Sequence, residues 1–262
     1  MAMELETRTM RSHIPNIDLD TPEIQEMRLD LAAALRMCAH LGLHEGIDNH
    51  FSALLPGENN LFLVNPYGLS FSEVTASSLL ICDFEGNVVK GDGQPEGSAF
   101  FIHARIHKLL PRARVAFHTH MPNATALSML DSEPFDWSIQ SSLKFYGRLA
   151  FDTNYSGLAL DELEGDRIAL SVGDADVVFM QNHGVMVVGP TIAQAWDDLY
   201  FLERAAEVQI KALSTGRKTK PVRPEIAQKV FEEEHAALPA TSRRHLDSVH
   251  RILRKREPDY AQ

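Results

Sequence analysis

The sequence has few cysteines and no long hydrophobic run. Only two cysteines, Cys38 and Cys82, occur among 262 residues, and both lie in apolar surroundings. We expect two buried thiols in a reducing compartment, the cytoplasm, rather than a disulfide. No apolar run approaches the roughly 18 residues that suggest a membrane span, so the sequence argues against a membrane protein.

Positive charge is also scarce. The formal net charge is −11, and no basic cluster of note precedes residue 211. A general affinity for nucleic acid or for an anionic membrane surface is therefore not expected. Residues 1–20 lack the apolar core of a signal peptide, and we predict that they form a flexible N-terminal arm. The twelve histidines are many for this length and point toward metal or proton chemistry.

Helix and strand signals alternate along the chain, without repeats or low-complexity linkers. Residues 21–42 predict a helix, with Thr21 as its N-cap and Gly42 just past its end. Residues 98–111 and 191–213 are typical of two further helices. Strand and hairpin patterns lie between the helices. The residues by themselves therefore predict an α/β or α+β domain with a mostly antiparallel sheet.

Two histidines end an apolar run in the stretch VAFHTHMP. On a strand, His118 and His120 share one face because side chains alternate between faces. A third imidazole, His183, follows a strand-like run and precedes Gly184, which would let the backbone bend there. Three protein ligands and one open position are typical of a catalytic zinc site. Ordinary hydrogen bonds could equally satisfy these polar side chains.

Two other patterns fit known sites less well. His103 and His107 have the helical spacing of metalloprotease ligands, but Ala104 stands where that mechanism needs a glutamate. We expect these histidines to pack against the sheet or to cap neighbouring groups. The glycine-rich stretch GDGQPEG lacks the G-x-G-x-x-G spacing of dinucleotide-binding loops.

With these motifs in view, the chain resembles the class II aldolase/adducin family. The matching stretches are GIDNHFS, FLVNPYGLSFSEVTASSLLICDFEGNVV, FFIHARIHKLLPRARVAFHTHMPNATAL and QNHGVMVVG. The resemblance implies a single three-layer α/β/α domain with a central, mostly antiparallel sheet. It also implies a homotetramer with active sites between neighbouring subunits, and a catalytic divalent metal, usually zinc (manganese, cobalt or iron are compatible). Its ligands would be His118, His120 and His183.

The resemblance also sets domain limits. We predict that residues 21–215 form the class II aldolase/adducin-like domain. Residues 216–262 form a charged C-terminal extension that we expect to be helical in pieces.

The chain departs from the sugar-phosphate aldolases of the family at two places. Where they carry P-S-S-E, this chain has P-E-G-S, so Glu96 lies close to the position of the catalytic acid but out of register. At the family's phosphate loop, the chain has His50 within N-H-F-S. A phosphorylated sugar is therefore not the expected substrate, and the chain sits nearer the adducin-like branch.

These residues lead to a functional hypothesis. We predict a metal-dependent carbon–carbon lyase, of aldolase or decarboxylase type, that acts on a small hydroxy-carbonyl or carboxylate compound. Glu96 and Tyr146 are the candidate catalytic residues, with Glu96 either an acid/base or a fourth metal ligand. His50 and Arg148 are the candidate substrate-binding residues.

Two rival hypotheses remain at this stage. An iron-dependent oxidative decarboxylase could use the same fold, although non-haem iron sites usually include a carboxylate ligand. A non-catalytic, adducin-like interaction module is the other. Such a module would be expected to lose the metal histidines, and all three are present here.

Overall fold

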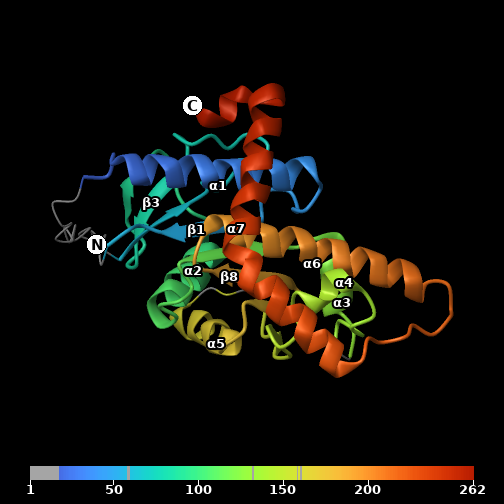
Figure 1. Ribbon diagram of the computed structural model, residues 1–262. Helices are drawn as coiled ribbons and strands as arrows, with labels where there is room; N and C mark the ends of the chain where they lie inside the picture. The colour runs from blue at the N-terminus through green and yellow to red at the C-terminus, as the bar shows by residue number, and fades with distance from the viewer. Residues whose placement is uncertain (1–17, 58–59, 132, 158, 160) are drawn as a thin grey trace, which may run out of the picture.

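The structure is a computed structural model that describes residues 18–57, 60–131, 133–157, 159 and 161–262 (Figure 1). Most of the predicted N-terminal arm therefore lies outside the described residues.

A single mixed sheet forms the centre of the molecule. Within the described residues it has eight strands in the order β4-β3-β2-β1-β5-β8-β7-β6. All neighbours pair antiparallel except β6 and β7, which confirms the mostly antiparallel prediction. The strands are β1 (His50–Leu54), β2 (Leu61–Val64), β3 (Leu80–Asp83), β4 (Val88–Lys90), β5 (Val115–Thr119), β6 (Leu149–Asp152), β7 (Val177–Met180) and β8 (Gly184–Gly189).

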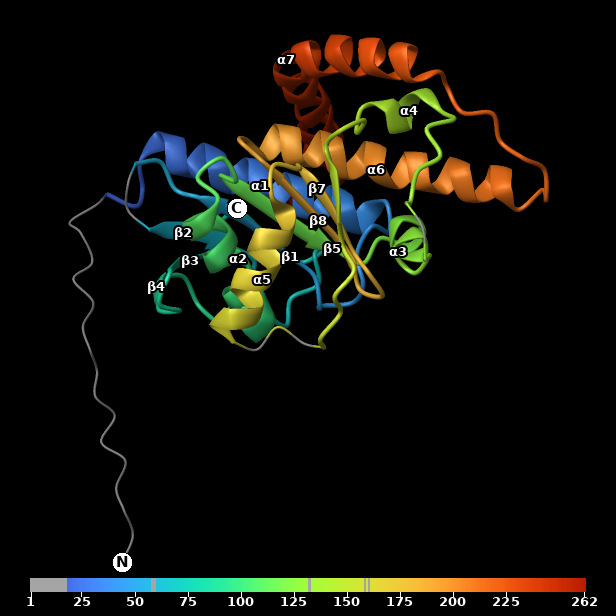
Figure 2. The same cartoon turned by 90° about the horizontal axis from the view of Figure 1, so that it is seen from below.

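Helices cover both faces of this sheet and complete the three layers (Figures 1 and 2). Helices α2 and α5 pack together on one face, whereas α1 and α6 cover the other and α7 packs across them. The short helices α3 and α4 pack against α6, and η1 packs against α1. The helices are α1 (Pro22–His40), α2 (Gly97–Leu109), α3 (Pro122–Ser128), α4 (Gln140–Leu143), α5 (Glu162–Val172), α6 (Ile192–Leu213), α7 (Pro224–Arg256) and the 3₁₀ helix η1 (Pro258–Ala261).

Strand alternation sorts the central side chains between the two faces. Phe51 and Phe117 stack with ring centroids 3.9 Å apart and belong to the core under α1 and α6. Their neighbours point the other way, because successive side chains alternate. His50 pairs directly with His118, and Ser52 with Ala116. These residues therefore face α2 and α5, and the histidines lie at the edge of the smaller core there.

The helix predictions are confirmed in their essentials. The Thr21 side chain caps α1 by accepting a hydrogen bond from the Ile24 amide. The C-terminal extension differs from its prediction, because α7 is one 33-residue helix rather than several pieces. Pro239 lies inside it, and the helix bends along its length in the figures. A proline removes one helical hydrogen bond and commonly kinks a helix without ending it.

The two cysteines are both buried and unpaired, as expected. In the part of the chain that the structure describes, no helix is long and apolar enough to span a membrane.

Candidate metal centre

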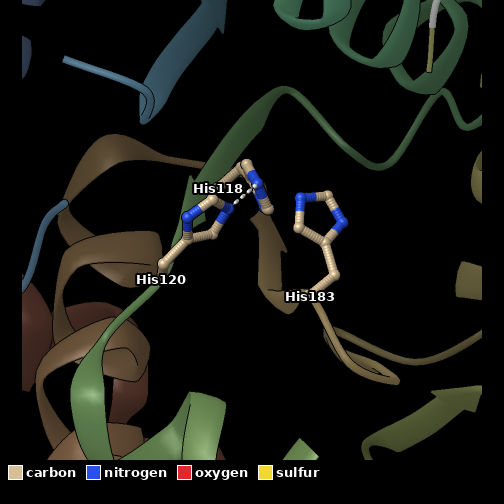
Figure 3. A group of neighbouring side chains, drawn as sticks. All are labelled: His118, His120 and His183. Carbon is tan, nitrogen blue, oxygen red and sulfur yellow. Dashed lines mark hydrogen bonds between the residues drawn. The ribbon is translucent and has the colours of Figure 1, made fainter. Parts of the chain in front are cut away.

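The three histidines singled out from the sequence meet at one edge of the sheet. His118 belongs to β5, His120 follows directly after it, and His183 lies in the loop between β7 and β8. Each contributes a ring nitrogen, and these nitrogens all lie within 4.8 Å of one another. Figure 3 shows the three rings turned toward a common point. This is the arrangement that strand alternation and the QNHG motif predicted.

Hydrogen bonds determine which nitrogen of two of these rings is free. The Nδ1 of His118 lies 2.9 Å from the Val185 carbonyl oxygen, and the Nδ1 of His120 lies 2.7 Å from a Glu45 carboxylate oxygen. Both partners accept only, so each Nδ1 carries the ring proton. When both rings are neutral, the two Nε2 atoms therefore present lone pairs, and they lie only 3.1 Å apart.

Two facing lone pairs repel each other unless a cation lies between them. Two nitrogens bound at about 2.0–2.1 Å to one tetrahedral ion would lie about 3.4 Å apart, close to the separation here. Hydrogen bonds from each Nδ1 to a carbonyl or a carboxylate are also typical of metal-bound histidines. The donor set therefore fits a divalent metal.

The tight β7–β8 hairpin places His183. Met180 pairs with Gly184 across the hairpin, and Asn182 between them adopts a left-handed conformation with φ 58°. Asparagine tolerates this conformation better than most residues. Burial, followed by the neighbouring His120, lowers the pKa of His183 to about 4. The ring is thus neutral at pH 7, as a metal ligand must be.

Glu45 was not singled out from the sequence. It lies in the loop before β1, and its carboxylate is largely exposed apart from its contact with His120. The Asn49 side-chain oxygen accepts hydrogen bonds from the amides of Glu45 and His120, which ties this loop to β5. In the sequence it directly precedes the matched GIDNHFS stretch (residues 46–52), and no spacing rule connects it with residue 120.

Replacing Glu45 with glutamine should weaken metal binding by about 10–100-fold, the usual effect of losing a partner that orients a histidine ligand. The glutamine side chain lacks the negative charge of the carboxylate, and that charge makes the His120 ring a stronger metal ligand. Competition with a chromophoric zinc chelator measures the change. The control is Glu73→Gln, at an acid whose carboxylate accepts a hydrogen bond from the Ser70 amide within its own turn. Equal affinities for both variants and the wild type would contradict the assigned role.

His50 lies beside the metal histidines, as its predicted role requires. Its ring centroid is 4.9 Å from that of His118, and the side chain is almost fully buried. Burial, and next the adjacent His103, hold its pKa well below the usual range for histidine. His103 and His107 are buried against the sheet and bond to Ser52, which confirms that they are packed polar groups.

Glu96 has a clear structural task. It is the N-cap of α2, where its carboxylate accepts hydrogen bonds from the Ala99 amide at 2.8 Å and from the Ser98 hydroxyl. An N-cap satisfies otherwise unpaired amides of the first helical turn. Its predicted catalytic role stays a prediction, in competition with this cap.

Tyr146 and Arg148 are not brought to the histidines of their own chain. Arg148 bonds to Asp176 and Asp198 at 2.6 Å each, a buried set of contacts that ties the start of β6 to α6. The length of β7, about 10 Å, separates this end of the sheet from the His183 loop. The Tyr146 ring packs on Trp137. We therefore leave both residues out of the site formed within one chain.

Two other polar groups do lie near His183. The Tyr155 ring is 6.2 Å from the His183 ring and is about half exposed. Both residues line a small pocket together with Arg167, which bonds to Asp152 at 2.6 Å. The sequence offers no signal for this grouping, because residues 144–157 show no regular helix or strand pattern.

The fold and the histidine site together define a class II aldolase-like protein. Residues 29–210 match the family model described as the class II aldolase and adducin N-terminal domain. The chain therefore belongs to the class II aldolase and adducin family. The predicted fold and family are both confirmed.

Individual relatives fall into two groups. A Caulobacter vibrioides protein, provisionally named an aldolase class 2 protein, is 39% identical over 78% of this chain and 79% of its own. Rat alpha-adducin is 30% identical over 72% of this chain, and the matched region covers only 26% of the length of the adducin.

Solved structures support the same assignment. An aldolase II superfamily protein from Pseudomonas syringae has a TM-score of 0.86 at 32% identity, covering 92% of this chain and 97% of that one. L-fuculose 1-phosphate aldolase from Glaciozyma antarctica has a TM-score of 0.81 at 26% identity, covering 95% and 98%.

Proposed function

We propose that the protein is a metal-dependent carbon–carbon lyase whose divalent ion, zinc in the first instance, is held by His118, His120 and His183. The observation that carries this proposal is that the Nε2 atoms of His118 and His120 lie 3.1 Å apart. The Nδ1 atom of each ring faces an acceptor, the Val185 carbonyl oxygen or the Glu45 carboxylate, so that Nε2 of each neutral ring carries a lone pair. A protein that only bound partners through its surface would have no need for such a pair.

The proposed chemistry divides between the ion and the chain. When bound, the ion supplies a Lewis acid that polarises a substrate oxygen and stabilises negative charge as a carbon–carbon bond breaks. Val185 and Glu45 hold two of the ligand rings in the required tautomer. Burial of His118 excludes bulk water, which strengthens the electrostatic interactions there. Glu96 is the proposed proton carrier, and Tyr155 is a second candidate because its ring lies 6.2 Å from that of His183.

The substrate is proposed to be a small hydroxy-carbonyl or carboxylate compound without a phosphate. This rests on the departures at His50 and Glu96, since the Glaciozyma relative is named for a phosphorylated sugar. Aldol cleavage and decarboxylation both break a bond to a carbon that must carry negative charge, so the site fits either.

We further propose a homotetramer in the cytoplasm with sites between neighbouring subunits. Leu163 and Leu170 are 80% and 73% exposed, seven residues apart on one face of α5. A pair of leucines on one helical face supports burial against another subunit. The two unpaired cysteines support a reducing compartment.

Exchange of a substrate α-proton in D₂O tests this function. Zinc-loaded protein, incubated with a panel of small hydroxy-ketones and 2-hydroxy acids, should introduce deuterium at the α-carbon of at least one of them. Removing the metal with a chelator should abolish the exchange. Glu96→Gln should lower it by about 100-fold or more if the carboxylate carries the proton, since general acid–base groups typically contribute that much.

Glutamine keeps an oxygen that can accept the Ala99 amide, so this variant should fold normally. Unchanged exchange in Glu96→Gln would remove that residue from the mechanism. No exchange and no metal in the wild type would favour the adducin-like interaction module instead.

A further inference from the structure

Four buried polar side chains form a continuous hydrogen-bonded chain beneath the metal histidines. Ser52 and His50 come from β1, and His103 and His107 from α2. The contacts run from His107 Nε2 to Ser52 Oγ at 2.7 Å, from Ser52 Oγ to His103 Nδ1 at 2.5 Å, and from His103 Nε2 to His50 Nδ1 at 2.6 Å. All four residues are at most 4% exposed, so water cannot readily compete for these bonds.

The far end of the chain sets its direction. His107 Nδ1 lies 2.8 Å from the Ala113 carbonyl oxygen, which can only accept, so this nitrogen carries the proton. Burial lowers the pKa of His107 to about 4, and the ring is therefore neutral with an unprotonated Nε2. The Ser52 hydroxyl then donates to His107 at 2.7 Å rather than to the Ala116 carbonyl oxygen, which lies 3.5 Å away.

The same argument fixes which nitrogen is protonated in the next two rings, His103 and His50. Since the hydroxyl proton of Ser52 is donated to His107, the Ser52 oxygen accepts a hydrogen bond from the Nδ1–H of His103. A neutral His103 then has an unprotonated Nε2, which accepts from the Nδ1–H of His50. None of these contacts includes a carboxylate that would stabilise an imidazolium, and the charged form would be costly at this depth. This leaves Nε2 of His50 unprotonated, as a hydrogen-bond acceptor.

We propose that Ser52, His103 and His107 are positioning residues that hold His50 as a hydrogen-bond acceptor, so that the substrate must present a hydroxyl there and not a phosphate. This rests on the proposed function, because the His50 ring lies beside His118 of the metal centre. A hydroxyl can donate to Nε2 of His50. The oxygens of a phosphate dianion are acceptors only and would meet a lone pair in a buried site, which is unfavourable.

The proton positions can be observed directly. Neutron diffraction from crystals of the zinc-loaded, deuterium-exchanged protein should show deuterium on Nδ1 of His50, His103 and His107, and none on Nε2 of His50. Deuterium on Nε2 of His50 would overturn the proposal. This readout does not depend on activity, and it stands even if the protein proves to be something other than a lyase.

Ligand binding tests the expected preference for a hydroxyl over a phosphate at His50. Glycolohydroxamate and acetohydroxamate share one chelating group and differ by a single hydroxyl. Isothermal titration calorimetry of the zinc-loaded wild type should show about tenfold tighter binding of glycolohydroxamate, the value of one hydrogen bond. The O-phosphorylated glycolohydroxamate should bind more weakly than the unphosphorylated compound. Equal binding of the first two, or tighter binding of the phosphorylated one, would overturn the proposal.

Ser52→Ala removes the central link of the chain. The preference for glycolohydroxamate should fall below about threefold while acetohydroxamate binds as before, because the metal is untouched. Ser142→Ala is the matched control. Ser142 is equally buried, but it lies in α4 on the other side of the sheet and donates to the carbonyl oxygen of Ile139, the N-cap residue of that helix. A full preference retained in Ser52→Ala would contradict the positioning role. If the wild type binds no divalent metal, the lyase proposal alone is refuted, and neutron diffraction from crystals of the metal-free protein would still decide the tautomer of His50.

Discussion

His118→Ala should yield a folded protein that retains essentially no divalent metal, whereas the wild type holds about one ion per chain. His118 is the most buried of the three proposed ligands, and its Nδ1 is held by the Val185 carbonyl. Two remaining imidazoles cannot complete a site that needs three protein ligands. Metal content is measured by inductively coupled plasma mass spectrometry after gel filtration, and α-proton exchange should disappear together with the metal.

His250→Ala is the matched control for this substitution. His250 is also buried, but it bonds to Asp30 and Tyr260 where α7 meets α1, away from the metal centre. This variant should keep its metal even if it is less stable. Metal retained at wild-type level in His118→Ala would contradict the assigned site.

The identity of the ion distinguishes between two enzymatic mechanisms. Zinc supports the lyase, because it provides Lewis acidity without redox chemistry. Iron would instead favour an oxidative decarboxylase on the same fold. Aerobic and anaerobic assays separate these outcomes, since only the oxidative reaction consumes dioxygen.

Gly184→Ala should disrupt the metal centre from a position that has no functional group. A Cβ atom at its ideal position there would lie 2.7 Å from the Thr119 carbonyl oxygen and 2.8 Å from Cδ2 of His120. Backbone and ligand ring would both have to move. We expect a loss of about 1–3 kcal/mol in the free energy of unfolding, as for overpacked sites. Metal affinity should fall at least tenfold, because the movement displaces a ligand by a few tenths of an ångström or more.

Gly189→Ala, at the other end of the same strand, is the control. Its added Cβ would have no neighbour nearer than 3.5 Å, an ordinary contact. Urea denaturation gives the unfolding free energies, and zinc competition gives the affinities. Comparable values for the two alanine variants would show that close packing at residue 184 does not shape the site.

The three histidines proposed as metal ligands are the part of the site that the sequence could predict. Period-two alternation places His118 and His120 on one face once the run is read as a strand. Gly184 marked the turn that carries His183. Both signals are local, and the structure brings the three ligand nitrogens together as expected.

The surroundings of these ligands could not be predicted in the same way. Glu45 meets His120 across 75 residues of sequence, and Ser52 meets His107 across 55. No local periodicity connects such positions. Arg148 depends on distant partners in the same way. It was predicted to bind substrate, and within this chain its guanidinium group bonds to Asp198 of α6 and to Asp176, directly before β7.

The sequence by itself determined the family, the mostly antiparallel sheet and the three candidate metal-binding histidines, because each depends on spacing along the chain or on a matched motif. Only the tertiary structure decided the proton positions. The Ala113 and Val185 carbonyls and the Glu45 carboxylate determine which nitrogen of each partner ring holds a proton, and these acceptors come from distant segments. A neutral imidazole donates at one nitrogen and accepts at the other, so its chemistry depends on what the folded chain places beside it.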